Sequence, residues 1–283
     1  MISRGKKYLI TGGTGVIGYH LCEKILNMGG EVIVLSRNEN NLNKLKEKYN
    51  EIETVVGDVC DRELIKDTIK KVNGVFHLAA LAQGMQSGKP VESIHTNLIG
   101  SMNVLESSTD VDFVLGISSD KAVQVSGTYG ATKFLMEKLF SQFEENNPKI
   151  KYRIVRLGNI IYSTDSVLCK WKKLIQHCEE LTVTDYNATR FYLTPEESVN
   201  LILNCLKNSV DSKPYFEYTK STSIGDLLQA MTNKYLSSDC ELPINVIGLQ
   251  PNENLHEKIS EDGSFTNEID SYTITELEEL IWL

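Results

Sequence analysis

An α/β fold with a doubly wound parallel sheet of the Rossmann type and a smaller C-terminal lobe is predicted for this chain of 283 residues. Segments typical of strands and of helices alternate up to residue 160, which indicates βαβ units and a parallel sheet. A glycine-rich turn follows the first strand, and beyond residue 160 the alternation weakens. We therefore expect residues 1–160 to form mainly a dinucleotide-binding domain. Residues 161–283 are expected to form mainly a smaller substrate lobe, in one compact bilobal unit.

The glycine-rich turn lies between a strand predicted over 8–10 and a helix predicted over 19–26. Glycines at 12, 15 and 18 allow a tight turn, a close approach to a pyrophosphate and close packing of helix on strand. The helix N-terminus then faces the phosphate charge. This context predicts a dinucleotide site, the alternative being an ordinary glycine-rich turn. The residues expected to bind are Thr11, Gly12, Thr14, Gly15, Val16, Ile17 and Gly18.

The segment after the second predicted strand, 31–35, bears on the choice of cofactor. An acid there would bind the ribose 2′-hydroxyl of NAD, whereas an arginine accommodates the 2′-phosphate of NADP. The chain has Ser36 and Arg37, and no carboxylate before Glu39. This favours NADP. NAD remains open, because a surface Arg37 stacked on the adenine would serve either cofactor.

Two further strand ends belong to the predicted cofactor site. The third strand ends in Gly-Asp-Val, where Asp58 can accept a hydrogen bond from the adenine amino group beside Val59. The fourth strand runs through His77 into the small segment Leu78, Ala79 and Ala80, which leaves room for a ribose. A histidine among apolar strand neighbours is expected to be structural rather than catalytic.

The candidate catalytic residues are Ser119, Asp120 and Lys121, followed by Tyr129 and Lys133. Residues four apart on a helix lie on one face. Lys133 could therefore lower the phenol pKa of Tyr129 from about 10 and make it a base near neutral pH. Asp120 and Lys121 add a second acid and a second base, which indicates chemistry at two adjacent carbons. The alternative for that pair is a surface ion pair at a strand end.

In this order, the motifs resemble those of the extended short-chain dehydrogenase/reductases. Within them the chain is similar to the inverting UDP-N-acetylglucosamine 4,6-dehydratases of pseudaminic acid and capsule biosynthesis. The segments that carry the resemblance are SSDKA before YGATK, RLGN at 156–159, TRF at 189–191 and QPNENLHE at 250–257.

The resemblance implies a role for each candidate. Tyr129 would take the proton of the sugar 4-hydroxyl while the nicotinamide takes hydride from C4, with Ser119 bonded to the same hydroxyl. Lys133 would hold the nicotinamide ribose. Lys121 would remove the C5 proton, and a protonated Asp120 would help the C6 hydroxyl to leave. Protonation of C5 from the opposite face would invert that centre.

Outside the catalytic group, the resemblance adds Asn97 to the cofactor site, on a helix predicted over 91–107. Asn159, Arg190 and Glu253 would bind substrate, Arg190 at the diphosphate or uracil and Glu253 at the uridine ribose. For Arg190 and Glu253 the alternative is a surface salt bridge. The chain departs from the family at Ala82, where a lysine is usual, and at 162–166, which lacks the usual arginine.

These departures leave the substrate open. The leading hypothesis is an enzyme that oxidises C4 of a UDP-N-acetylhexosamine transiently and dehydrates C5–C6, epimerises C5, or both. A second hypothesis is an enzyme of the next step, acting on the dehydrated 5,6-ene or 4-keto UDP-sugar. A third, of another class, is a non-catalytic regulator that senses NAD(P).

The composition of the chain bears on its partners, its metal content and its cellular location. The net charge of −9 and the absence of a basic patch argue against nucleic acid as a partner. No signal peptide opens the chain and no apolar run reaches the roughly 18 residues of a membrane helix. Six cysteines without a CxxC pair are expected to be reduced and to bind no metal. The expected location is therefore the cytoplasm.

Two expectations concern surfaces. The helix that continues from Lys133 carries an apolar stripe of Leu135, Leu139, Phe140 and Phe143. The resemblance implies a homodimer formed by this helix and that of 91–107, so the stripe could be interface rather than core. From Glu261 onward the acidic, turn-rich sequence predicts a loosely held tail that ends in a short helix.

Overall fold

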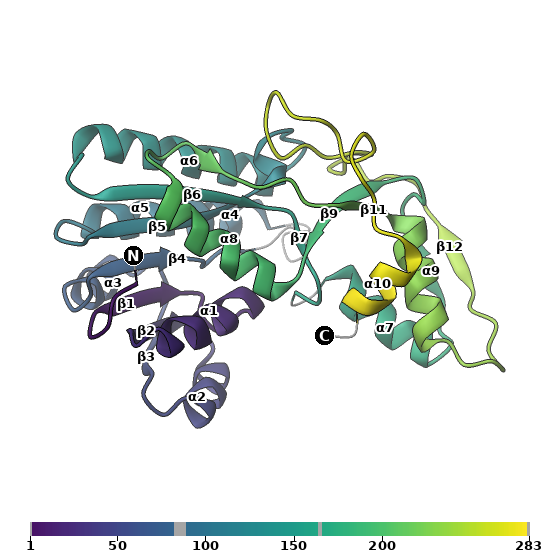
Figure 1. Cartoon of the computed structure of the whole chain (residues 1–283), viewed down its shortest axis with the longest axis horizontal. Helices are drawn as coiled ribbons and strands as arrows, with labels where there is room; N and C mark the ends of the chain where they lie inside the picture. The colour runs from purple at the N-terminus through teal and green to yellow at the C-terminus, as the bar shows by residue number, and fades with distance from the viewer. Residues whose placement is uncertain (1, 82–88, 164–165, 282–283) are drawn as a thin grey trace.

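The computed structural model describes residues 2–81, 89–163 and 166–281. At its centre is a seven-stranded sheet in the order β10-β6-β5-β4-β1-β2-β3, with every neighbouring pair parallel (Figure 1). The strand order reverses between β1 and β4, where doubly wound sheets bind ligands. The predicted fold class is confirmed. The strands are β1 (Lys7–Thr11), β2 (Glu31–Ser36), β3 (Glu53–Val56), β4 (Gly74–His77), β5 (Phe113–Ser119), β6 (Lys151–Leu157) and β10 (Pro214–Tyr215).

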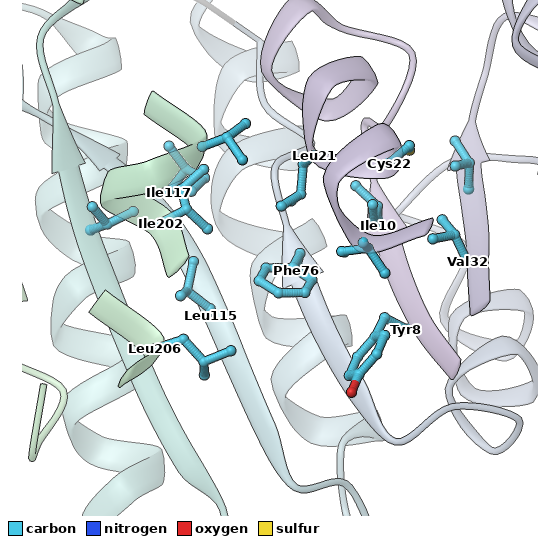
Figure 2. Close-up of a cluster of buried hydrophobic side chains, with 14 of the residues drawn as sticks. Tyr8, Ile10, Leu21, Cys22, Val32, Phe76, Leu115, Ile117, Ile202 and Leu206 are labelled. Atoms are coloured by element: carbon cyan, nitrogen blue, oxygen red, sulfur yellow. The ribbon is translucent and has the colours of Figure 1, made fainter. Parts of the chain in front are cut away.

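Helices cover both faces of this sheet. One face packs against α1 (Val16–Asn27), α2 (Glu39–Lys48) and α8 (Pro195–Asn208) through a core that includes Ile10, Leu21, Phe76 and Ile202 (Figure 2). The other face packs against α3 (Arg62–Ile69), α5 (Gly100–Ser107) and α6 (Thr128–Asn146). The short α4 (Pro90–Ile94) continues through a π-helical turn, His95–Ile99, into α5, so the predicted helix over 91–107 is present.

The apolar stripe of α6 serves mainly the core. Phe140 is fully buried, and Leu139 and Phe143 pack against the cluster beneath the helix. Leu135 is 44% exposed, and the neighbouring Phe134 is 37% exposed. The stripe is therefore divided, because only the first turn after Lys133 turns its apolar side chains to the outside.

The C-terminal lobe contains two small sheets and three helices. One sheet has the order β11-β9-β7 and the other pairs β12 with β8. The core between them includes Trp171, Leu227, Met231 and Leu277. The elements are β7 (Asn159–Ile160), α7 (Val167–Gln176), β8 (Leu181–Val183), β9 (Thr189–Leu193), β11 (Ser221–Ser223), α9 (Ile224–Tyr235), β12 (Ile244–Val246) and α10 (Ile274–Leu280).

Between these lobe elements the chain returns to the large sheet. α8 begins with a capping box formed by Thr194 and Glu197, packs on α1 and β6, and leads to β10 at the edge of the sheet. α8 therefore belongs to the large layer, although residues 161–283 were expected to form mainly the smaller lobe. Capping is local, whereas the layer a helix joins depends on the surface that covers its apolar side.

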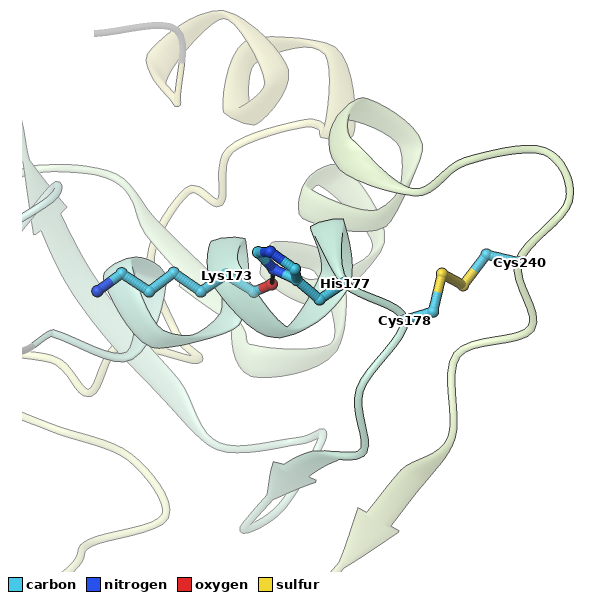
Figure 3. Close-up of a disulfide and its surroundings, with 4 residues drawn as sticks. All are labelled: Lys173, His177, Cys178 and Cys240. Carbon is cyan, nitrogen blue, oxygen red and sulfur yellow. Dashed lines mark hydrogen bonds between the residues drawn. A yellow bond between two sulfur atoms is a disulfide. The ribbon is translucent and has the colours of Figure 1, made fainter.

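The expectation of six reduced cysteines is wrong for two of them. Cys178, just after α7, and Cys240, before β12, form a disulfide (Figure 3). Parallel pairing of β8 with β12 brings the segments before these strands together, which no spacing in the sequence indicates. Cys22, Cys60, Cys169 and Cys205 are free.

The tail after residue 261 is docked rather than loosely held. Thr266 and Leu277 are fully buried, and α10, the short helix expected there, packs on α9. At the start of the tail Glu261 accepts two hydrogen bonds from Arg156, whose guanidinium also pairs with the buried Glu137 of α6. No helix in the described part of the chain is both long and apolar enough to cross a membrane.

Candidate active site

A cavity of about 420 Å³ opens at the carboxyl ends of β1, β2 and β4. Thirteen predicted cofactor residues line it: Gly12, Thr14, Gly15, Val16, Ile17, Gly18, Ser36, Arg37, Asp58, Val59, Leu78, Ala79 and Ala80. The lining residues that the sequence reading missed are Leu35, Asn38, Asn41, Gly57, Leu81, Thr96, Ile117 and Ser163. Several of these are next to predicted residues in the chain, and that adjacency was the available signal. Ser163 lies three residues after the end of β7 and gave no such signal.

The glycine-rich turn fits a dinucleotide. Gly12 has a φ of +70°, and a Cβ there would lie 2.8 Å from the backbone of Ala79. The turn therefore needs glycine, both for its left-handed conformation and for the close approach to the end of β4. α1 begins directly behind it at Val16, so its free N–H groups face the cavity where a pyrophosphate would lie.

Two predicted cofactor residues lie behind the lining. The Thr11 hydroxyl forms a hydrogen bond of 2.8 Å with His77 Nδ1 and accepts another from the backbone N–H of Ala79. Asn97 bonds the backbone of Leu81 through both amide atoms and also reaches Thr132 of α6. Both residues thus hold the segment after β4 in place instead of lining the cavity.

His77 is structural, as predicted. It is 2% exposed, and its two ring nitrogens contact Thr11 Oγ1 and Ser101 Oγ. Burial, with a smaller contribution from the charge of Lys133, lowers the pKa of His77 to about 3. The ring is therefore neutral and fixed at physiological pH.

The adenine end of the cavity combines Ser36, Arg37 and Asp58. The Ser36 hydroxyl lies 2.9 Å from that of Thr14, and Arg37 Nη1 lies 3.5 Å from Asp58 Oδ2. Arg37 is largely exposed, and it lines an open hollow together with Asn38, Glu39 and Asn40. The arginine is thus placed where either a 2′-phosphate or an adenine could meet it.

The candidate catalytic residues meet at the end of β5. Ser119 is its last residue, and Asp120 and Lys121 follow in a 3₁₀ turn. The Asp120 carboxylate accepts from Ser119 Oγ at 2.6 Å and pairs with Lys121 Nζ at 2.9 Å. Asp120 is 1% exposed, so the alternative of a surface ion pair does not hold.

α6 packs directly against this turn. A Cβ on Gly130 would lie 2.2 Å from the carbonyl oxygen of Lys121, so only glycine permits the contact. The contact brings Tyr129, Lys121 and Asn252 around a small cavity of about 50 Å³. The predicted catalytic residues are therefore brought together, beside the dinucleotide cavity.

Tyr129 and Lys133 lie one turn apart on α6, as predicted, but their electrostatics differ from the expectation. The Lys133 ammonium donates to the carbonyl of Ile117 at 2.7 Å and lies 5.8 Å from the centre of the Tyr129 ring. Burial and then the Asp120 charge raise the pKa of Tyr129 to about 12, although a hydrogen bond with Ser119 lowers it. Burial, which Glu137 partly offsets, lowers the pKa of Lys133 to about 8.

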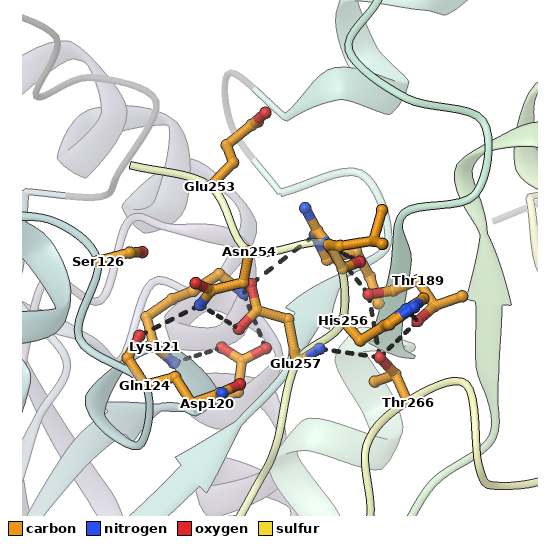
Figure 4. Close-up of polar contacts among 12 residues, drawn as sticks. Asp120, Lys121, Gln124, Ser126, Thr189, Glu253, Asn254, His256, Glu257 and Thr266 are labelled. Carbon is orange, nitrogen blue, oxygen red and sulfur yellow. Dashed lines mark hydrogen bonds and ion pairs between the residues drawn. The ribbon is translucent and has the colours of Figure 1, made fainter. Parts of the chain in front are cut away.

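Glu257 is a member of the site that the sequence reading did not single out. Its carboxylate is 1% exposed and lies 3.1 Å from Lys121 Nζ (Figure 4). Burial and, to a smaller extent, the charge of Arg190 lower the pKa of Lys121, but the charges of Asp120 and Glu257 outweigh them and the pKa is raised. The only signal in the sequence was membership of the 250–257 motif.

The three predicted substrate residues come from different elements. Arg190 is buried, donates to the carbonyls of Thr189 and Leu255, and approaches Glu257 to 3.9 Å. Glu253 belongs to the same 250–257 segment as Glu257, but its side chain points away from Lys121 (Figure 4). Asn159 begins β7 beside Tyr192 of β9. For Arg190 the surface salt bridge is therefore excluded by its burial.

The segments in which the chain departs from the family are described only in part. Ala82 lies outside the described residues, as do 83–88 and 164–165. Tyr162 and Ser166 have structural contacts: the Tyr162 hydroxyl lies 2.8 Å from that of Tyr235, and Ser166 caps α7.

This geometry defines a short-chain dehydrogenase/reductase scaffold, with a dinucleotide cavity at the switch point of the sheet and a Ser–Asp–Lys/Tyr–Lys group beside it. The chain belongs to the polysaccharide biosynthesis protein family, whose model matches residues 8–279. It is 30% identical to the inverting UDP-N-acetylglucosamine 4,6-dehydratase of Campylobacter jejuni subsp. jejuni serotype O:23/36, over 95% of this chain and 82% of the relative. It is also 30% identical to the UDP-glucose 4-epimerase of Rickettsia bellii, over 94% of this chain and 82% of the relative.

A solved structure has the same fold. Pen from Bacillus thuringiensis superposes with a TM-score of 0.91 at 26% identity, covering 99% of this chain and 98% of that one. The family model and the Campylobacter dehydratase confirm, at the level of the family, the resemblance inferred from the motifs.

Proposed function

We propose that this chain is an NAD(P)-dependent enzyme that oxidises C4 of a UDP-N-acetylhexosamine transiently and eliminates water across C5 and C6, with or without inversion at C5. The product would serve a pseudaminic-acid-type or other cell-surface sugar. The observation that carries the proposal is the juxtaposition of Tyr129 with the Asp120–Lys121 pair beside a dinucleotide cavity. A simple alcohol dehydrogenase would not require that pair. The names of the two curated relatives support the substrate class.

The chain's own groups account for the proton movements. Tyr129 would accept the proton of the 4-hydroxyl, with Ser119 orienting that hydroxyl. Lys133, between the Ile117 carbonyl and the Tyr129 ring, would hold the nicotinamide ribose. A bound nicotinamide would supply the reversible acceptance of hydride at C4, and the resulting ketone would acidify the C5 proton.

The Asp120–Lys121 ion pair can generate both groups that elimination needs. Transfer of one proton from Lys121 Nζ to Asp120 Oδ2, across 2.9 Å, leaves a neutral amine and a carboxylic acid. The amine would then take the C5 proton, and the acid would give its proton to the departing C6 hydroxyl, releasing water. The pair then has the ionised state seen in the structure. C6 would receive the hydride back and C5 a proton, which would complete a dehydration without net reduction of the cofactor.

Incubation with UDP-N-acetylglucosamine tests the proposal, with the sugar followed by mass spectrometry and proton NMR. The expected result is loss of one water without net reduction of the cofactor, abolished in Tyr129→Phe. An unchanged sugar, from folded protein with bound cofactor, would favour the second-step enzyme, and the dehydrated UDP-sugar would then be offered. If neither sugar were turned over, the hypothesis of a non-catalytic regulator that senses NAD(P) would remain.

We infer a preference for NADP from Ser36 and Arg37. Arg37 is held beside Asp58 at the adenine end, and no carboxylate lines the cavity at the end of β2. Arg37→Ala should weaken NADP binding roughly tenfold or more, the size of a lost charge-assisted contact, and NAD binding much less. Equal weakening of both would indicate that Arg37 only stacks on the adenine.

We also propose a homodimer through the α4–α5 and α6 helices. Val91, Ile94 and Ile99 on the first, and Phe134 and Leu135 on the second, are all exposed apolar side chains. A cytoplasmic location is proposed as well, because nucleotide cofactor and UDP-sugar are both available there.

A further inference from the structure

Four charged side chains lie together in the interior next to the candidate catalytic group. Lys121 Nζ is 2.9 Å from Asp120 and 3.1 Å from Glu257, and Arg190 Nε is 3.9 Å from the same Glu257 oxygen. Both carboxylates are 1% exposed. A buried charge without a partner is strongly destabilising, so the two carboxylates and two cations are interdependent.

Glu257 is itself held firmly from the C-terminal lobe. Its backbone N–H donates to Thr266 Oγ1 at 2.9 Å, and Asn254 Nδ2 donates to its Oε2 at 3.3 Å (Figure 4). The same Asn254 amide donates to the carbonyl of Gln124, and Ser126 Oγ donates to that of Asn252. The segment 252–257 is thus fastened to the turn that follows Lys121, and Glu257 cannot move independently of it.

We propose that Glu257 is a positioning residue that acts on the reaction through Lys121. It fixes the ammonium beside Asp120, where one proton can pass between the two, and it favours the protonated form of Lys121 that removal of the C5 proton produces. The inference rests on the proposed function, in which Lys121 takes the C5 proton.

The charged and titratable groups that face Lys121 come from four elements. Asp120 is in its own turn, Tyr129 is on α6, Arg190 is on β9 and Glu257 is in the loop after β12. Asp120 and Glu257 favour the ammonium, whereas Arg190 opposes it. Removing the charge of Glu257 should therefore lower the pKa of Lys121.

Two variants separate position from charge. Glu257→Gln keeps the shape and a hydrogen-bond acceptor, and it should shift the rising limb of the pH–rate profile to lower pH. Glu257→Ala removes the contact, and it should slow uptake of solvent deuterium at C5 roughly tenfold to hundredfold, the cost of misplacing a catalytic group. Cofactor affinity should stay unchanged in both. Asp262→Asn, which removes an exposed carboxylate five residues further along the chain, is the matched control.

The experiment uses the full chain with bound cofactor and UDP-N-acetylglucosamine in deuterated buffer. In parallel, NMR of labelled lysine, assigned with Lys121→Arg, follows the titration of Lys121 without substrate. A wild-type pH profile and an unshifted Lys121 titration in Glu257→Gln would overturn the inference. A lowered Lys121 pKa in a protein that does not act on UDP-N-acetylglucosamine would instead overturn the proposed function.

Discussion

The phenol of Tyr129 and the carboxylate of Asp120 lie at one small site, and this limits how Tyr129 can ionise. Burial is the main reason that the pKa of Tyr129 is raised to about 12, and the negative charge of Asp120 adds to it. A cation near the phenol would have the opposite effect, but Lys133 is bonded to the Ile117 carbonyl. Base catalysis near neutral pH therefore needs a further change in the site, such as the positive charge of a bound oxidised nicotinamide.

The contribution of Asp120 can be measured directly. Removing a nearby negative charge favours the phenolate, so Asp120→Asn should lower the pKa of Tyr129. Ser119→Ala should raise it, because the contact with Ser119 lowers the pKa of Tyr129. Ultraviolet difference titration reports both shifts, with Tyr129→Phe in each background to isolate this one phenol. Shifts of the same sign in the two variants would contradict this account.

At the scale of elements, the Cys178–Cys240 disulfide fastens the end of α7 to the segment before β12. Its loop spans 62 residues, and closing a loop of that length stabilises the folded state by about 4 kcal/mol in the chain-entropy model. We expect Cys178→Ser to lower the unfolding midpoint, and reductant to lower that of the wild type by a similar amount. Cys169→Ser, at a free cysteine, is the control and should respond to reductant as the wild type does.

Thiol counting under denaturing conditions checks the pairing itself. Protein isolated without reductant should have four reactive thiols out of six cysteines. Six thiols in protein taken from the cytoplasm would show that the pair is reduced there, as is usual in that compartment.

The contact between Glu261 and Arg156 fastens the start of the C-terminal tail to β6. Its hydrogen bonds to Arg156 are the main reason that the pKa of Glu261 is lowered from 4.5 to about 2. A lowered folded-state pKa stabilises the protein above the ordinary pKa, and this contribution is lost as the pH falls from about 4.5 to about 2.

Glu261→Gln should therefore be less stable than the wild type at neutral pH, and the two should converge as the pH falls through that window. Urea unfolding at several pH values measures the difference. Because the Glu261 side chain is 62% exposed, solvent screening should keep the effect small. A difference that does not change with pH would show that the lost contact is not electrostatic. Asp262→Asn serves as the control.

At the scale of the whole molecule, the proposed dimer would bury the exposed apolar side chains of the α4–α5 and α6 helices. Leu135→Lys replaces a side chain that is 44% exposed, so the folded monomer should tolerate it, whereas an apolar interface should not. We expect the wild type to sediment as a dimer and the variant as a monomer with unchanged circular dichroism. Val210→Lys, at a site that is 86% exposed on the segment before β10, is the control. A wild type that sediments as a monomer would contradict the proposal.

The sequence by itself determined the features that depend on local patterns of residues. The glycine-rich turn, the alternation of strands and helices and the four-residue spacing of Tyr129 and Lys133 follow from contacts between residues close in the chain. The residue types also pointed to Ser119, Asp120 and Lys121 as a group, the resemblance gave each of them a role, and the structure places the group in one site.

Only the tertiary structure decided which distant segments meet. It placed Glu257 on Lys121, paired Cys178 with Cys240, returned α8 and β10 to the large sheet and docked the tail. It also made the pKa of Tyr129 rise where the spacing predicted a fall. The physical reason is the same in each case: burial, charge pairing and layer packing depend on neighbours far away in sequence, which periodicity and spacing do not encode.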